Sequence, residues 1–221
     1  MKHFSLKTYI KENPHVWYLL LLPAYLLLFY LAERLVPSDG SYWVSYLPLD
    51  DHIPFLEIFI VPYCAWYPLL VGVGLALLLF DGENFKKYML FIMAGNITAL
   101  LFCILVPNGQ ELRPESFERH NVFTWLIGKI YAVDTNTNVF PSMHVIGSVG
   151  AVVAAFKSEK LRPRRWPILA LAVLVIASTV FVKQHSVLDI FGGLAWCVPL
   201  YLVIYGIKGK RKREKEKGKA I

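Results

Sequence analysis

The chain has 221 residues, of which 56% are hydrophobic, and its mean hydropathy is +0.48. Because a soluble domain is usually roughly 45–50% apolar, this composition favours an integral membrane protein. The net charge of +7 does not indicate a nucleic-acid partner, since the segment 206–221 holds eight Lys and Arg residues against two Glu, which leaves the rest nearly neutral. The three cysteines are far apart in apolar runs, so they form neither a CxxC motif nor a disulfide framework.

Six apolar runs alternate with polar connections along the chain, and we predict that each forms a transmembrane helix. Crossing the hydrocarbon core takes about 20 helical residues. The expected spans cover residues 16–36, 53–80, 88–106, 141–156, 166–182 and 185–207. No long repeat or second domain is evident. The sequence therefore predicts an all-α integral membrane protein, a six-transmembrane-helix bundle that forms a single membrane domain over residues 1–221.

The connections between the predicted spans differ in character. Residues 1–15 form a short basic N-terminus, 81–87 a short polar turn, and 208–221 a basic tail. The longest connection, 107–139, exceeds the roughly 12–15 residues beyond which a loop is usually functional or disordered. Its apolar side chains are expected to dip into lipid or to cover a site; they are Phe117, Phe123, Trp125 and Ile127.

Basic residues indicate which side of the membrane each connection faces. Of the 23 Lys and Arg residues, 18 lie in the N-terminal segment, in the connections 81–87 and 157–165, and in the tail. Only four lie in the intervening connections. Because positive charge marks the cytoplasmic side, we expect both termini to be cytoplasmic, in a plasma or inner membrane. The helices that begin near Pro141 and His185 then start at the extracytoplasmic face.

The stretch Phe140-Pro141-Ser142-Met143-His144 opens the fourth predicted span. Proline favours the first turn of a helix, where free backbone N–H groups and the helix dipole can bind a phosphate. Small residues follow at four-residue spacing on the face of His144, so this histidine should face other helices and not lipid. By itself, the same stretch also fits a helix cap followed by a packed histidine. The functional interpretation therefore depends on a second motif.

The second motif, His185-Ser186-Val187-Leu188-Asp189, opens the sixth predicted span at the same face. Residues four apart share one helix face, so Asp189 can accept a proton from the His185 imidazole and fix its tautomer. A histidine held in this way is a nucleophile, and His144 can act as the general acid and base. We expect Arg113, Lys183, Ser142 and Met143 at the helix start to supply donors to a phosphate.

Together with Arg113-Pro114, these two stretches resemble the three signature motifs of the type 2 phosphatidic acid phosphatase superfamily, over roughly residues 105–193. The resemblance implies a lipid phosphate substrate, a phosphohistidine intermediate on His185, acid/base catalysis by His144 and an orienting role for Asp189. It also implies that no metal and no other cofactor is needed.

Two positions depart from the pattern of that superfamily. Its first motif carries a lysine where this chain has Val106, and its third motif carries an arginine where this chain has Thr179. Lys183 is the candidate replacement for the lost charge. Lys183-Gln184-His185 is similar to the inositolphosphorylceramide synthase-like branch, whose members transfer a phosphoryl-alcohol headgroup between lipids.

Three functional hypotheses follow from these residues. A lipid phosphatase is favoured by the small size of the chain. A lipid phosphotransferase remains open, because water and an alcohol would use the same base. A transporter or membrane scaffold is the non-enzymatic alternative, but the ionisable groups gather at one end and do not line the membrane midplane.

Overall fold

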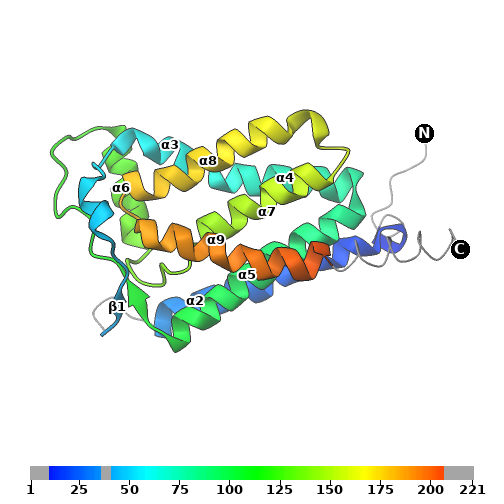
Figure 1. Ribbon diagram of the computed structural model, residues 1–221, viewed down its shortest axis with the longest axis horizontal. Coiled ribbons are helices and arrows are strands. Elements are labelled where there is room, and N and C mark those ends of the chain that lie inside the picture. The colour runs from blue at the N-terminus through cyan, green and yellow to red at the C-terminus, as the bar shows by residue number, and fades with distance from the viewer. Residues whose placement is uncertain (1–9, 36–40, 207–221) are drawn as a thin grey trace, which may run out of the picture.

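The computed structural model of the chain describes residues 10–35 and 41–206. Most of the basic N-terminus predicted at residues 1–15 and the whole basic tail predicted at residues 208–221 therefore lie outside the described residues. The described part is mostly helical, and its long helices run side by side as a bundle (Figure 1).

Five helical stretches are long and apolar enough to cross a membrane, which makes this a multi-pass membrane protein. The first joins the 3-10 helix η1 (Pro14–Leu20) to α2 (Leu21–Leu35), and the second joins η3 (Glu57–Phe59), α3 (Ile60–Cys64) and α4 (Trp66–Phe80). The third is α5 alone (Gly82–Leu105). The fourth joins η4 (Arg162–Arg164) to α8 (Arg165–Phe181), and the fifth joins α9 (Val187–Tyr201) to the π-helical turn η5 (Leu202–Gly206).

The remaining predicted span is the shorter helix α7 (Met143–Lys157). At 1.5 Å per residue its 15 residues extend about 22 Å, less than the roughly 30 Å hydrocarbon core. The helix lies in the middle of the bundle and contacts α4, α5, α8 and α9. Its small residues, among them the buried Gly150, Ala151 and Ala154, permit this close packing. The all-α bundle is thus confirmed, whereas the count of six spans is not.

The turn predicted at residues 81–87 is wrong, because α5 already begins at Gly82. The side chain of Asp81 caps this helix by accepting from the Asn84 N–H at 3.3 Å, and Glu83 pairs with Lys86 at 2.7 Å within the first turn. Both interactions stabilise a helix start. The polar residues of this segment therefore cap and begin a helix.

The long connection 107–139 is folded across one end of the bundle, which we call the site end. It contains the strand β2 (Asn108–Gly109) and the helix α6 (Val122–Val133). β2 pairs in parallel with β1 (Trp43–Val44) from the connection between α2 and α3, which also holds the 3-10 helix η2 (Pro48–His52). In α6 Ile127 is fully buried, whereas Trp125 is exposed. Figure 1 shows β1 and α6 at the end where α8 finishes and α9 begins.

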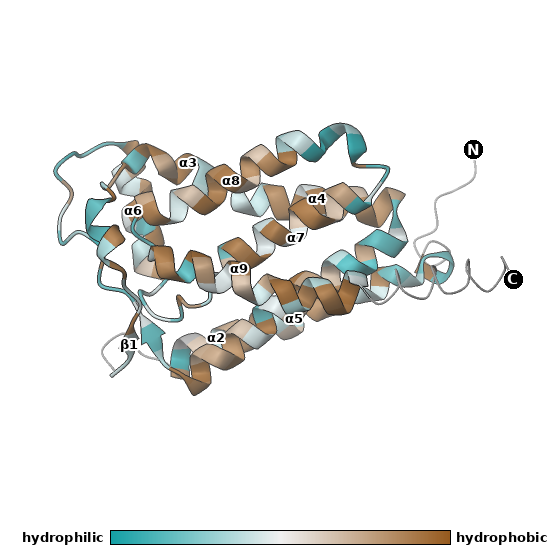
Figure 2. Ribbon diagram, viewed as in Figure 1, coloured by the Kyte–Doolittle hydropathy of each residue, from teal (hydrophilic) through white to brown (hydrophobic). Residues whose placement is uncertain are grey.

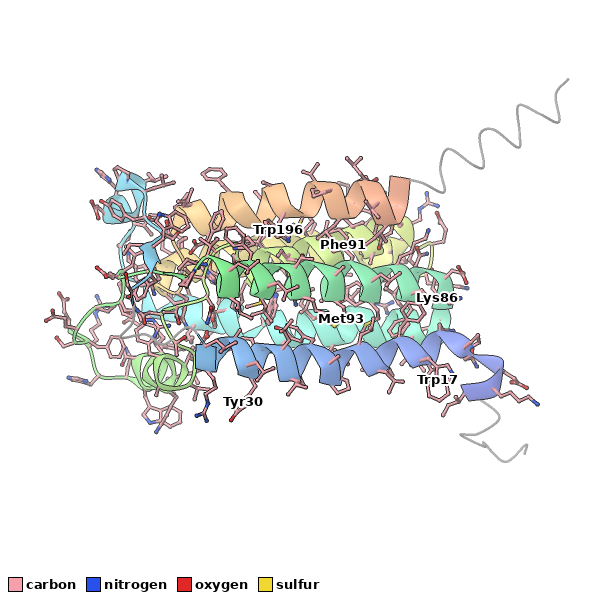
Figure 3. All side chains as sticks on the ribbon, turned by 90° about the horizontal axis from the view of Figure 1, so that it is seen from below. Trp17, Tyr30, Lys86, Phe91, Met93 and Trp196 are labelled. Carbon is pink, nitrogen blue, oxygen red and sulfur yellow. The ribbon has the colours of Figure 1, made fainter. Side chains whose placement is uncertain are left out.

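Polar residues gather at both ends of the bundle and apolar residues along its length (Figure 2). Tyr30 lies towards the site end, and Lys86 marks the opposite end (Figure 3). The connections α4–α5 and α7–α8 meet at that opposite end, where Asp81 accepts a hydrogen bond from Ser158 at 2.6 Å. Seven of the described basic residues lie in or beside these connections, several of them in the adjoining turns of α5, α7 and α8: Lys86, Lys87, Lys157, Lys160, Arg162, Arg164 and Arg165.

Candidate active site

One hydrogen-bonded row at the site end contains Asp189, His185 and His144. We call it the catalytic row, after the role predicted for its residues. The Nδ1 atom of His185 is 3.1 Å from Asp189 Oδ2, and its Nε2 atom is 3.3 Å from His144 Nδ1. The side chain of His185 is 9% exposed and that of Asp189 is fully buried. The structure therefore brings together the three residues predicted to be catalytic, although it does not test their roles.

The start of α9 explains how Asp189 comes to face His185. Ser186 is the N-cap, and its side chain accepts from the Leu188 N–H at 3.0 Å. Asp189 occupies the third helical position and accepts from the Ser186 N–H at 2.9 Å, which completes a reciprocal capping box. The same carboxylate oxygen reaches His185, which lies just before the cap. A local helix-start motif thus orients the imidazole.

His144 reaches the row from the first turn of α7. Ser142 caps this helix, and its N–H donates to the carbonyl oxygen of Asp189 at 3.2 Å. The imidazole packs against Tyr63 and Trp66, with ring centroids 4.7 and 4.6 Å away. Its Nε2 atom is buried and has no hydrogen-bond partner among the described residues.

Two adjacent glycines of α9 allow the start of α7 to come this close. An ideal Cβ atom at Gly193 would lie 2.7 Å from Val145 Cβ and 3.0 Å from the carbonyl oxygen of Ser142. A Cβ atom at Gly192 would lie 2.3 Å from the ring of Phe140. All three distances are below normal van der Waals separation, so side chains at these positions would force the two helices apart. Neither glycine was predicted from the sequence to contribute to the site.

A mostly apolar cavity of about 590 Å³ extends from the two histidines along the bundle. It lies between α2, α4 and α5, and α6 and the following loop border its polar end. Along α4 the lining residues run from Trp66 to Leu78, which corresponds to about 18 Å. One leaflet of the hydrocarbon core is about 15 Å deep. The cavity is therefore long enough to follow a lipid chain through one leaflet.

Arg113 is held by the surrounding backbone. Its Nη2 atom donates to the carbonyl oxygens of Asp134 and Thr135 at 2.9 and 2.8 Å and to the side chain of Gln184, and its guanidinium lies over the Tyr131 ring at 4.4 Å. Gln184 in turn donates to the Asp134 carboxylate at 3.3 Å. Arg113 thus lies close to the catalytic row, one residue away through Gln184, but it does not line the cavity.

Lys183 lies in the tight connection between α8 and α9, in a left-handed backbone conformation with φ 54°. Its ammonium donates to the carbonyl oxygens of Asp50 and Ile53 at 3.1 and 2.6 Å, and it does not line the cavity either. Burial lowers the pKa of Lys183, and the nearby carboxylates of Asp50 and Asp51 act in the opposite direction. The phosphate-binding roles expected for Arg113 and Lys183 remain predictions.

Ser142 and Met143, the other expected phosphate ligands, lie at the start of α7. Ser142 is fully buried, and its hydroxyl accepts from the Val145 N–H at 3.5 Å. Met143 lines the cavity, and its sulfur accepts from the Tyr25 hydroxyl at 3.7 Å. Their roles towards phosphate are also untested.

Three residues of the site were missed by sequence reasoning. Ser45 donates to Asp189, Asp50 accepts from the start of α9, and Asp134 lines the cavity. The only sequence signal was the pair Asp50-Asp51 in a connection without Lys or Arg. Within the part of the chain that the structure describes, no group of three or more His, Cys, Asp or Glu side chains has metal-binding geometry.

A multi-pass helical bundle with two histidines and a carboxylate at the end of a cavity fits the class of membrane enzymes that act on phosphate esters. The family model described as the PAP2 superfamily matches residues 89–213, more than half of the chain, so the chain belongs to the PAP2 superfamily. Members are generally phosphatases or related phosphoryl-transfer enzymes. The superfamily resemblance is confirmed, and the inositolphosphorylceramide synthase-like branch stays a prediction. Comparisons with curated proteins and with solved structures found no match.

Proposed function

We propose that the protein is a membrane lipid phosphatase that hydrolyses a lipid phosphate or diphosphate ester through a phosphohistidine on His185. The observation that carries this proposal is the apolar cavity that ends at the His144–His185 pair. A lipid chain in the cavity would bring its phosphate to the nucleophile. A water-soluble phosphate ester would gain nothing from such a cavity, because only apolar surface is stabilised by burial there.

In the first step, Nε2 of His185 attacks phosphorus, and the bond between phosphorus and the lipid oxygen breaks. Asp189 accepts from Nδ1 and stabilises the positive charge that develops on the ring. His144 acts as an imidazolium: it gives its Nδ1 proton, which lies beside His185, to the leaving oxygen and becomes neutral. In the second step, His144 takes a proton from water, the water oxygen attacks phosphorus, and the phosphorus–nitrogen bond of His185 breaks.

The negative charge on the transferring phosphoryl group needs nearby donors. We assign this task to Arg113, Lys183, Ser142 and Met143, as the sequence predicts. When substrate binds, Arg113 and Lys183 would release the backbone carbonyl oxygens to which they donate and would donate to phosphate oxygens instead. The start of α7 would contribute backbone N–H groups. No metal ion is required for any of these steps.

The site is proposed to face the extracytoplasmic side of a plasma or inner membrane, with both termini cytoplasmic. The support is the cluster of seven described basic residues at the end opposite the site, since cytoplasmic connections carry the excess of Lys and Arg. Substrate would therefore enter from the outer leaflet.

Transfer of a phosphoryl-alcohol headgroup is the second candidate function. The polar end of the cavity favours it, because Asp134, Thr135 and Asn138 line the same cavity as His144 and carry groups that can hydrogen-bond an alcohol. His144 would then activate an alcohol in place of water, and the steps on His185 would be unchanged.

A panel of lipid phosphates, lipid diphosphates and headgroup phosphodiesters, offered to the purified protein in detergent, tests the proposal. A phosphatase releases inorganic phosphate without an added alcohol, whereas a transferase forms a phosphoryl-alcohol product that requires one. Vanadate, which mimics five-coordinate phosphorus, should inhibit either enzyme. Absence of turnover on every lipid together with no vanadate binding would favour a transporter or scaffold.

A further inference from the structure

The connection between α2 and α3 lies outside the region 89–213 matched by the family, yet it touches the catalytic row. Ser45 in this connection is fully buried. Its hydroxyl donates to Asp189 Oδ1 at 2.5 Å. Its backbone is fixed at the same time, because the Ser45 N–H donates to the carbonyl oxygen of Gly109 at 2.7 Å beside the β1–β2 pair.

The two carboxylate oxygens of Asp189 have separate partners. Oδ2 accepts from His185 Nδ1 and from the Ser186 N–H. Among the described residues, only Ser45 donates to Oδ1. A buried carboxylate oxygen without a donor carries a desolvation cost, and a carboxylate held at one oxygen alone can rotate. Ser45 therefore fixes the plane of the carboxylate that orients His185.

A second contact fastens the same connection to the start of α9. Asp50 is buried and accepts from the Ser186 hydroxyl at 2.6 Å and from the Val187 N–H at 2.8 Å. The Lys183 ammonium donates to the Asp50 carbonyl oxygen. The connection is thus tied to residues on both sides of His185, which keeps the Ser45 hydroxyl in register with Asp189.

We propose that Ser45 is a positioning residue of the active site, which acts on His185 through Asp189. This inference rests on the proposed function, in which His185 is the nucleophile. It adds to the three motifs a fourth element from an N-terminal connection. The titratable and charged groups that face the His185–Asp189 pair are His144 from α7, Asp50 from the connection, and Lys183 beside His185; Asp134 and Arg113 lie behind Gln184.

The test compares Ser45→Ala with Ser41→Ala, an exposed serine of the same connection. In Ser45→Ala, kcat should fall by about 10- to 100-fold, since a hydrogen bond to a charged group is lost, while KM changes by less than about twofold. A fall in kcat at constant KM indicates that the nucleophile is misplaced while substrate binding is unchanged. Ser41→Ala should match the wild type in both quantities.

A thermal denaturation curve separates mispositioning from misfolding, and Ser45→Cys provides a second variant in case the alanine variant does not fold. The thiol is a weak donor of similar size, so the kcat of Ser45→Cys should be intermediate and its KM should again change by less than about twofold. A folded Ser45→Ala or Ser45→Cys with wild-type kcat would overturn the role of Ser45. Failure of the proposed function looks different, because the wild-type protein itself would then turn over no lipid phosphate.

Discussion

At the scale of single residues, the site depends on Asp189, which both caps a helix and contacts the candidate nucleophile. Its carboxylate caps α9 through the Ser186 N–H and also orients His185. His144 comes from a different helix and contacts the far nitrogen of the same imidazole. The roles proposed for the three side chains therefore differ, and their variants should fail in different ways.

His185→Ala and His144→Ala should each abolish turnover, because one removes the nucleophile and the other removes the acid and base. Asp189→Asn should retain measurable activity, reduced by roughly three to four orders of magnitude, since it spoils orientation but leaves the nucleophile in place. Steady-state rates of purified variants with wild-type thermal denaturation would check this. Near-normal activity of either folded histidine variant would contradict the assignment.

The sequence predicted the histidines and Asp189 because each belongs to a short motif at a helix start, where spacing alone fixes which side chains can meet. It did not predict Ser45 or Asp50, because these reach the site from a connection far away in the chain, nor Asp134, which follows α6 and whose place at the cavity depends on how that loop folds. Position 45 is 144 residues from Asp189, and nothing in the residues around Ser45 indicates the partner of its hydroxyl.

At the scale of elements, the site depends on how closely the start of α7 approaches α9. Gly192 and Gly193 provide the space for this approach. The sequence predicted both helices within two residues of their observed starts but not their close contact, because a glycine pair has no specific meaning until its neighbours are known.

Gly193→Ala should separate the two helices and displace His144 from His185, since the new methyl group would meet Val145 and the Ser142 carbonyl oxygen. A displacement of 1 Å at a catalytic group is sufficient to reduce the rate by about 100-fold, and overpacking should lower the thermal stability as well. Gly206→Ala is the matched control, because a Cβ atom there meets nothing within 4 Å. Equal rates for Gly193→Ala and the control would show that the close approach is dispensable.

The cavity between α2, α4 and α5 gives a prediction about chain length. Gly74 lines it, eight residues along α4 from Trp66, which corresponds to about 12 Å from the histidine end. Gly74→Phe should lower kcat/KM for long-chain lipid phosphates by about tenfold and leave short-chain substrates unaffected, because the ring would block the inner part of the cavity. The measurement is kcat/KM over a series of chain lengths.

Gly72→Phe serves as the control for the cavity prediction, since Gly72 does not line the cavity and a Cβ atom there is in open space. This variant should keep the wild-type chain-length profile. If both variants or neither of them changed the profile, the cavity would not be the site of the lipid chain.

At the scale of the whole molecule, the candidate catalytic residues and a cluster of basic residues lie at opposite ends of the bundle. The candidate catalytic residues lie where α7 and α9 begin, and the seven basic residues of the opposite end lie around the start of α5 and the connection from α7 to α8. The sequence predicted this polarity, because charge counts do not depend on packing. The sequence also predicted a helix at α7, but whether it is a sixth span stays a prediction, because burial among four helices and exposure to lipid both select apolar side chains.

Removal of metal ions should leave activity within about twofold of its starting value. The proposed steps use histidines as nucleophile and acid, and the described residues gather no cluster with metal-ligand geometry. Turnover before and after EDTA, followed by addition of Mg²⁺, would check this. Loss of activity in EDTA that Mg²⁺ restores would contradict the metal-free mechanism.

Trapping of the covalent intermediate tests the central claim most directly. Purified protein would be mixed with a lipid phosphate labelled at phosphorus, quenched in alkali, where phosphohistidine survives, and mapped by peptide mass spectrometry. The mechanism predicts label on His185 in the wild type and none in His185→Ala. Turnover by the wild type without label on His185, or label that persists in His185→Ala, would contradict it.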